Sequence, residues 1–325
     1  MDHCSNGAQH SPMTPVEAYK YAYNLLHEGN YKDGFRLFEL RWHPDAIATL
    51  DEPFEKYTPA PVWQGENLFG KHIIVQMEMG YGDCIQFARF LPMLKVWGAE
   101  KLTVLQTGSL HHLMAQMPCI DYITNDEKTG VSQEADYWVG SMSLLYFATH
   151  APKQIQYLFP CSPEHVVGRD GYLDAPPIEL QGDIKIGVNW EASKRYLHGV
   201  KSLDANYMAK LKKAFPNATF YSLNPEDNGP FEALPTDGWK TNWLETASYM
   251  KSMDAVVTVD TGTAHCAGAL GVPCYVILPP EDYVCWRWKT KAWYNSITTI
   301  PHASGIEGVI EKLGDQHGNH LRLAS

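Results

Sequence analysis

Apolar residues near the start of the chain recur every three or four positions. They form two runs between residues 15 and 45, separated by the dipeptide Gly29-Asn30. This spacing predicts two helices joined by a tight turn, because residues three or four apart share one face of a helix. A single hairpin cannot bury its own apolar face, so we expect it to pack on a neighbouring part of the protein.

After a proline-rich stretch, short apolar runs alternate with amphipathic stretches. Buried strands are predicted at 72–76, 102–105, 121–124 and 136–139, with an amphipathic helix at 85–96. Apolar runs of this length, bounded by turn residues, are typical of strands that are covered on both faces.

The same alternation resumes after a stretch rich in proline and charge between residues 152 and 182. Further strands are predicted at 184–190, 219–223, 255–259 and 274–278, and helices at 204–215, 243–252, 263–270 and 305–313. Strands that alternate with helices predict an α/β fold in which parallel sheets carry helices on both faces.

The interruption divides the chain into parts. We predict a tail and helical hairpin over residues 1–50, a first Rossmann-like domain over 51–175, and a second one over 176–325 that includes a C-terminal helix. Two such domains face each other across a cleft, and their ligands bind at the carboxyl ends of the strands.

Composition limits the class of protein. Of the 325 residues, 45% are hydrophobic and 19% are charged, which excludes intrinsic disorder. The formal net charge of −11 disfavours a broad nucleic-acid surface, although a nucleic-acid acceptor stays open. No run approaches the ~18–20 apolar residues that span a bilayer.

The cysteine and histidine residues indicate the redox environment and bear on metal binding. The seven cysteines are odd in number and contain no Cys-x-x-Cys pair, so we expect reduced thiols and a cytoplasmic protein. The 14 histidines form no His-x-x-x-His or His-Glu-x-x-His motif, and we expect no metal site.

The sharpest candidate site follows the third predicted strand of the second domain. Asp260, Thr261, Gly262 and Thr263 form a turn of small and polar residues, and His265 lies in the first helical turn. Backbone N–H groups and the helix dipole attract anions at such a corner, and His265 can donate a hydrogen bond or a proton to phosphate. A capped helix with small residues for close packing on the sheet explains the same pattern equally well.

A second candidate follows the first predicted strand. Gly80, Tyr81 and Gly82 precede Asp83 at a helix start, where a carboxylate can act as general base on a hydroxyl. Ile85 stands where a dinucleotide fingerprint has its third glycine, so that motif is excluded. The alternative role for Asp83 is a helix N-cap, the more common use of aspartate at this position.

Two further segments carry candidate chemistry. Asn189 and Trp190 end the first strand of the second domain, and Lys194 and Lys201 follow, where a cation can neutralise phosphate unless the loop is simply solvated. The aromatic and basic segment 286–294 can stack on a sugar or base, or pack beneath a loop that closes the domains.

Four stretches together resemble a known family. Residues 63–71 read Trp-Gln-Gly-Glu-x-Leu-x-Gly-Lys, 78–89 read Glu-Met-Gly-Tyr-Gly-Asp-Cys-Ile-Gln-Phe-Ala-Arg, 259–271 read Val-Asp-Thr-Gly-Thr-Ala-His-Cys-Ala-Gly-Ala-Leu-Gly, and 286–294 contain Trp-Arg-Trp and Trp-Tyr. Over about residues 15–300 the chain resembles bacterial tetratricopeptide-linked glycosyltransferases, which are similar to the heptosyltransferases of glycosyltransferase family 9. The resemblance implies a GT-B fold with a short tetratricopeptide-like hairpin, the acceptor on the first domain and the nucleotide-sugar donor on the second.

The resemblance also implies roles for single residues. Asp83 matches the general base of the family. The predicted donor-binding residues are Asn189, Trp190, Lys194, Lys201, Ser222, Leu223, Asp260, Thr261, Gly262, Thr263 and His265, with one of the two lysines on the diphosphate and Ser222 and Leu223 beside the nucleoside. The predicted acceptor-binding residues are Gly80, Tyr81, Gly82 and Gln86.

We therefore expect an inverting, metal-independent glycosyltransferase of the hexosyl or heptosyl type, with the nucleotide-sugar as co-substrate and no other cofactor. The absence of an Asp-x-Asp motif agrees with this expectation. Two alternatives stay open: a nucleotide-sugar epimerase or hydrolase on the same fold, and a non-catalytic nucleotide-binding or interaction module. The sequence does not predict the donor, the acceptor or the oligomeric state.

Overall fold

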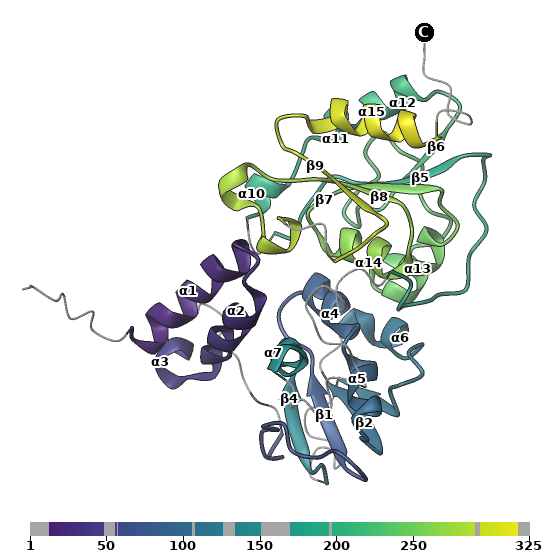
Figure 1. The fold of residues 1–325 in the computed structure, drawn as a ribbon. Helices are drawn as coiled ribbons and strands as arrows, with labels where there is room; N and C mark the ends of the chain where they lie inside the picture. Colours follow the sequence, from purple (N-terminus) through teal and green to yellow (C-terminus); the bar gives the residue numbers. More distant parts are fainter. Residues whose placement is uncertain are drawn as a thin grey trace, which may run out of the picture.

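The structure is a computed structural model that describes residues 13–48, 56, 58–105, 108–125, 134–150, 170–194, 197–289 and 293–317. Three parts follow one another along the chain: a group of N-terminal helices, a first lobe over the described residues from 58 to 150, and a second lobe from 170 to 317 (Figure 1). The predictions for the N-terminal tail and for most of the segment 152–182 lie outside the described residues, and the domain boundary at residue 175 stays a prediction.

The predicted helical hairpin is confirmed. Helix α1 (Pro15–His27) begins with a capping box in which Thr14 and Glu17 exchange hydrogen bonds, and α2 (Tyr31–Phe38) is capped by Asn30. A β-carbon on Gly34 would lie 2.7 Å from the Leu26 side chain, so glycine lets the two helices approach closely. The 3₁₀ turn η1 (Glu39–Trp42) and the short α3 (Pro44–Ile47) complete this part.

The first lobe contains a four-stranded sheet. Its strands are β1 (His72–Gln76), β2 (Lys101–Leu105), β3 (Tyr122–Thr124) and β4 (Tyr137–Gly140). They run parallel in the order β3-β2-β1-β4, with Ile74 opposite Thr103 on one side and Trp138 on the other. All four strands lie where the alternating pattern predicts them.

The helices of the first lobe correct one prediction. The predicted single helix at 85–96 is wrong, because the chain forms α4 (Tyr81–Ala88) and a separate α5 (Leu91–Val96). Pro92 lies in the first turn of α5, and in a continuous helix its ring would clash with the carbonyl of Ala88 and leave that carbonyl without its N–H donor. The lobe also contains η2 (Gly108–Leu110), α6 (His111–Met114) and α7 (Ser143–His150).

The second lobe contains a five-stranded parallel sheet in the order β6-β5-β7-β8-β9. The strands are β5 (Lys185–Asn189), β6 (Thr219–Ser222), β7 (Ala255–Val259), β8 (Cys274–Ile277) and β9 (Ile297–Ile300). Strand β9 was not predicted. It lies at the sheet edge and buries only Ile300, so its sequence lacks the continuous apolar run of a central strand.

Helices and 3₁₀ turns connect these strands. They are α10 (His198–Lys201), α11 (Ala205–Met208), α12 (Lys210–Ala214), η4 (Gly238–Lys240), α13 (Trp243–Met250), α14 (Gly262–Leu270), η5 (Glu281–Tyr283), η6 (Trp286–Trp288) and α15 (Gly305–His317). The two parallel sheets with helices confirm the α/β class and agree with a GT-B architecture.

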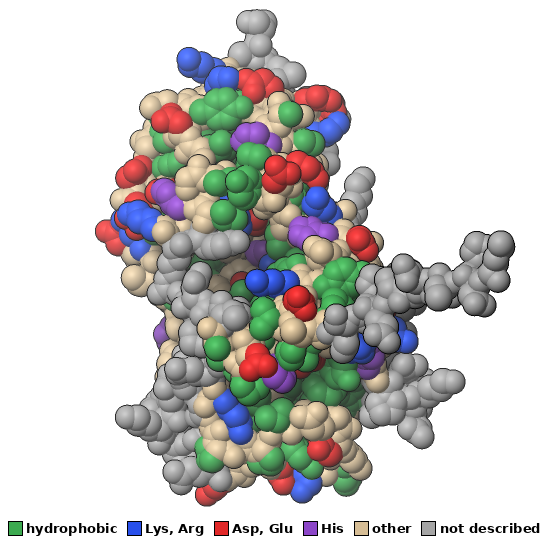
Figure 2. Space-filling model, turned by 90° about the vertical axis from the view of Figure 1, so that its left-hand side faces the viewer, with side chains coloured by type: hydrophobic (Ala, Val, Ile, Leu, Met, Phe, Trp, Pro, Cys, Tyr) green, Lys and Arg blue, Asp and Glu red, His purple; other side chains and the backbone are tan. Residues whose placement is uncertain are grey.

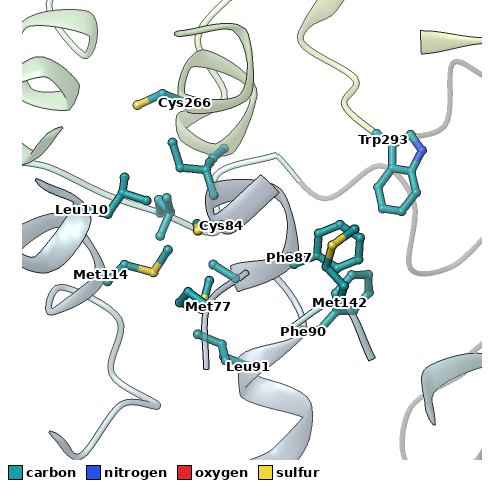
Figure 3. Close-up of a cluster of buried hydrophobic side chains, with 14 of the residues drawn as sticks. Met77, Cys84, Phe87, Phe90, Leu91, Leu110, Met114, Met142, Cys266 and Trp293 are labelled. Atoms are coloured by element: carbon teal, nitrogen blue, oxygen red, sulfur yellow. The ribbon is translucent and has the colours of Figure 1, made fainter. Parts of the chain in front are cut away.

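Helices α4 and α14 pack directly against each other where the lobes meet (Figure 1). Figure 3 shows the apolar side chains behind this contact: Cys84 and Phe87 of α4 lie in one cluster with Cys266 of α14 and with Trp293. Burial of such side chains from both lobes stabilises their contact.

The hairpin packs on both lobes, as the prediction of a neighbour requires. The Tyr31 and Phe35 rings lie 6.0 Å and 5.7 Å from the Trp286 ring of the second lobe, and α2 also packs on α7 of the first lobe. The hairpin is therefore an integral part of this fold.

Charged side chains of both signs are interspersed on the face that Figure 2 shows, the side on which the hairpin lies. Among the described residues, every helix is too short or too polar to cross a bilayer.

Candidate functional site

The sheet of the second lobe has a topological switch point. Strands β5 and β7 are neighbours whose connections leave the sheet in opposite directions, and ligands bind at the carboxyl ends of such a strand pair. Asn189 ends β5, and its Nδ2 donates to Thr263 Oγ1 at 3.0 Å and to Thr261 Oγ1 at 3.3 Å. These bonds tie the end of β5 to the start of α14.

Helix α14 begins at this switch point. Thr261 is its N-cap residue in an extended conformation, and its side chain makes no capping bond to the first helical turn. The partial positive charge of a helix start is therefore not offset by a side-chain cap, and an anion is the natural counter-charge.

Asp260 and Lys201 form a pair beside the α14 start. Lys201 Nζ lies 2.8 Å from Asp260 Oδ2, and Trp288 Nε1 donates to Asp260 Oδ1 at 2.7 Å. Burial raises the pKa of Asp260, but the Lys201 charge and both hydrogen bonds outweigh burial, and the pKa lies below its ordinary value. Asp260 is therefore ionised at neutral pH.

The two candidate lysines differ in position. The Lys201 side chain is 17% exposed and contacts Asp260, whereas Lys194 is 69% exposed and pairs with Glu226 at 3.1 Å. Of the two, Lys201 is the cation next to the start of α14.

His265 lies beneath this corner. Its ring is buried, stacks on Trp288 with a centroid distance of 5.0 Å, and shares a hydrogen bond between Nδ1 and the Tyr294 hydroxyl at 3.0 Å. Burial lowers the pKa of His265 to about 3, with the nearby Arg287 charge as the next cause. The imidazole is therefore neutral at physiological pH, and any interaction of His265 with phosphate would be that of a neutral hydrogen-bond donor.

Asp83 has the helix-capping role that the sequence offered as the alternative, and its carboxylate also pairs with the second lobe. Its Oδ2 accepts from Gly80 N at 3.1 Å, which caps the start of α4, and its Oδ1 accepts from Nη2 of Arg287 in the second lobe. The Asp83 side chain is 18% exposed and that of Arg287 is 13% exposed. A capping carboxylate thus faces the other lobe.

Gly82 brings the two helix starts together. A β-carbon on Gly82 would lie 2.7 Å from His265 Cδ2 and 3.4 Å from Gly262 Cα. The structure therefore places the start of α4, which carries Asp83, directly against the start of α14.

The other predicted acceptor residues lie on either side of this contact. Tyr81 is exposed, with its ring 5.9 Å from that of Trp243 and its hydroxyl donating to Ser109 Oγ at 3.3 Å. Gln86 is fully buried, and within the described part of the chain neither polar atom of its amide has a hydrogen-bond partner. Tyr81 is thus the more accessible of the two.

Three of the predicted donor-binding residues, Trp190, Ser222 and Leu223, are part of the core or the sheet. Trp190 is buried with its ring 5.4 Å from Phe231. Ser222 N donates to Glu232 O and Leu223 N donates to Val188 O, both at 2.8 Å. The backbone N–H groups at these two positions are therefore engaged within the protein.

Sequence reasoning missed the ion pairs of two arginines, Arg41 and Arg287. Arg41 is fully buried and makes a bidentate pair with Glu78, at 2.9 Å and 3.1 Å, at the end of β1. Its position between Leu40 and Trp42 in an apolar helical run was the available signal, because a cation on such a face needs a partner. Arg287 was noted only as part of an aromatic segment, and nothing in the sequence pairs it with Asp83.

Comparisons with known proteins bear on the fold that carries this site. No protein-family model matches the sequence. A glycosyltransferase family 9 structure from Veillonella parvula superposes with a TM-score of 0.50 at 15% identity, covering 79% of this chain and 93% of that one. The chain is similar in fold to glycosyltransferase family 9.

Two further proteins are similar to this chain. ADP-heptose lps heptosyltransferase II from E. coli superposes with a TM-score of 0.49 at 14% identity, covering 75% of this chain and 98% of that one. The curated protein FlbA from Caulobacter vibrioides is 22% identical over an alignment of 331 residues, covering 89% of this chain and 53% of FlbA. The chain therefore spans about half the length of this curated relative.

Proposed function

We propose that the protein transfers a sugar from a nucleoside-diphosphate sugar to an acceptor hydroxyl, with inversion at the anomeric carbon. The observation that carries the proposal is the contact of Gly82 with His265 and Gly262, since it brings the Asp83 carboxylate of one lobe beside the anion-attracting helix start of the other. The similarity in fold to family 9 also supports sugar transfer, although fold alone does not determine function.

The proposed reaction is a single displacement. The acceptor oxygen forms a bond to the anomeric carbon while Asp83 takes the proton of the acceptor hydroxyl. The bond between the anomeric carbon and the diphosphate oxygen breaks, and its electron pair leaves with the nucleoside diphosphate. General-base assistance of this kind contributes about 10²–10⁴-fold to a rate.

The leaving diphosphate needs charge stabilisation that is in place before the bond breaks. The uncapped start of α14 and Lys201 supply it in the proposed mechanism, and both belong to the second lobe. Asn189 bonds to Thr263 at the start of α14, and Asp260 fixes Lys201. Little reorganisation of these groups is therefore required as charge develops on the diphosphate.

A thermal-shift screen with ADP, GDP, UDP and their sugars tests donor binding. A ligand that binds only the native state stabilises it by about 2.7 kcal/mol at a concentration of 100 Kd. We expect one nucleotide class to raise the unfolding temperature, and Lys201→Gln to weaken its affinity by about 10–100-fold because a charge-assisted bond is lost.

Two comparison variants make the screen specific. We expect Lys194→Gln to leave nucleotide affinity unchanged, since Lys194 pairs with Glu226, and Lys312→Gln on the outer face of α15 serves as the control for loss of one charge. Donor cleavage without any acceptor would favour the epimerase or hydrolase alternative. Absence of binding by every nucleotide would contradict the proposal.

A further inference from the structure

Arg287 is the one residue of the second lobe whose side chain pairs with Asp83 among the described contacts. Its Nη2 donates to Asp83 Oδ1, and its Nη1 donates to Cys285 Sγ at 3.2 Å. Its Cζ lies 4.9 Å from the centre of the Trp286 ring, while its Nε is buried without a hydrogen-bond partner among the residues that the structure describes. The guanidinium is thus fixed in place but not fully bonded.

We propose that Arg287 is a ligand of the donor diphosphate and that it pairs with Asp83 only in the unliganded protein. This inference rests on the proposed function and adds a residue to it. When the donor binds, Arg287 exchanges Asp83 for phosphate oxygens, and the Asp83 carboxylate becomes available to the acceptor hydroxyl.

The charge arrangement around the start of α14 supports this exchange. Two cations, Lys201 and Arg287, are each paired with a carboxylate, Asp260 and Asp83 respectively. A diphosphate brings several negative charges to this balanced cluster, so its binding is favoured only if a cation turns from a carboxylate to the phosphate.

Arg287 is the cation that can make this change. Asp260 is buried and bonded by both Lys201 and Trp288, so loss of Lys201 would leave a buried charge short of partners. Asp83 is more exposed and keeps its bond from Gly80 N if Arg287 leaves. A guanidinium also matches phosphate oxygens with two parallel N–H bonds, whereas the structure shows one bond to Asp83.

The position of Arg287 fits a phosphate at the α14 start. It follows Trp286 and precedes Trp288, whose ring stacks on His265 and whose Nε1 donates to Asp260. The η6 turn that carries Arg287 is therefore anchored to the first turn of α14. An anion bound at the first turn of α14 would therefore lie next to η6 and its Arg287.

Isothermal titration with ADP, GDP and UDP, using the nucleotide that binds best, tests the exchange. We expect Arg287→Gln to weaken binding by about 10–100-fold and Arg287→Lys, which keeps the charge, to weaken it less. Asp83→Asn should strengthen binding by about 5–10-fold, because no ion pair has to be broken and one like charge is removed.

The double variant Arg287→Gln/Asp83→Asn separates the exchange from simple charge removal. If Asp83 acts by holding Arg287, Asp83→Asn gains markedly less affinity in the Arg287→Gln background than in the wild type. Lys289→Gln in the same segment, whose partner is Glu281, is the matched control and should bind as the wild type does. Unfolding temperatures without ligand show that each variant is folded.

The outcomes distinguish this inference from the function on which it rests. Nucleotide binding that Arg287→Gln leaves unchanged overturns the inference and leaves the proposed function standing. Equal gains from Asp83→Asn in both backgrounds, or no gain in either, overturn the exchange as well. Absence of nucleotide binding in the wild type and in Asp83→Asn alike overturns both.

Discussion

Gly82 and His265 are in van der Waals contact across the two lobes, and a β-carbon at position 82 would approach His265 Cδ2 to 2.7 Å. The imidazole cannot move away easily, because it stacks on Trp288 and is bonded to Tyr294. The contact therefore determines how closely the starts of α4 and α14 approach each other.

Substitution of this glycine should separate the lobes. We expect Gly82→Ala to lower the free energy of unfolding by about 1–3 kcal/mol, the usual cost of overpacking. Gly199→Ala is the matched control, because a β-carbon there meets nothing within 4 Å. Urea denaturation of both variants measures the difference, and an equal effect of the two would show that the contact at Gly82 is not tight.

The buried pair of Arg41 and Glu78 should dominate the attachment of the hairpin. We expect Arg41→Met to cost about 3–5 kcal/mol of unfolding free energy, because it leaves the Glu78 carboxylate buried without its partner. Arg36→Gln, which removes an exposed pair with Asp33, should cost at most about 1 kcal/mol. Similar losses for the two variants would contradict the assignment.

A double substitution refines this test. In Arg41→Met/Glu78→Met the buried Glu78 charge is removed together with its partner, and only the more exposed Glu39 loses an ion pair, so we expect the variant to recover part of the stability lost in Arg41→Met alone. Chemical denaturation at pH 7 measures the recovery. Additive losses would show that the two side chains contribute independently.

The buried His265 makes stability depend on pH. Its pKa is about 3 in the folded protein, against an ordinary value of 6.5, so the unfolded chain binds more protons between these two values and stability falls as pH falls through that window. Between pH 6.5 and 5 this amounts to about 2 kcal/mol. Denaturation at pH 7.5 and pH 5 should show a smaller decrease for His265→Gln than for the wild type.

The control for this measurement is His302→Gln, since His302 is exposed. We expect it to keep the pH dependence of the wild type. If His265→Gln also loses as much stability on acidification as the wild type, His265 is not held neutral by burial.

Much of the fold could be predicted because parallel strands buried on both faces read as continuous apolar runs. Strand β7 is buried at every position and was easily located, whereas β9 at the edge was missed. The break between α4 and α5 was missed, although Pro92 signals it, because proline is tolerated in the first turn of a helix but not in its interior.

The candidate site was predictable only in part. The residues that follow β1 and β7 were found from the rule that ligands bind at strand ends. No local feature of the sequence predicts that Asp83 pairs with Arg287, which lies 204 positions further along the chain. Likewise, the sequence around His265 does not predict that Trp288 and Tyr294 pack on its ring. Their packing buries the imidazole and keeps it neutral.

The proposed role of Asp83 is tested most directly by turnover of the nucleotide-sugar that binds best, measured as release of the nucleoside diphosphate in the presence of candidate acceptors. We predict that Asp83→Asn binds the nucleotide at least as well as the wild type but releases it about 10²–10⁴-fold more slowly, because no base accepts the acceptor proton. Asp45→Asn, at an exposed position in the hairpin, should turn over as the wild type does. Turnover by Asp83→Asn at the wild-type rate would contradict the account.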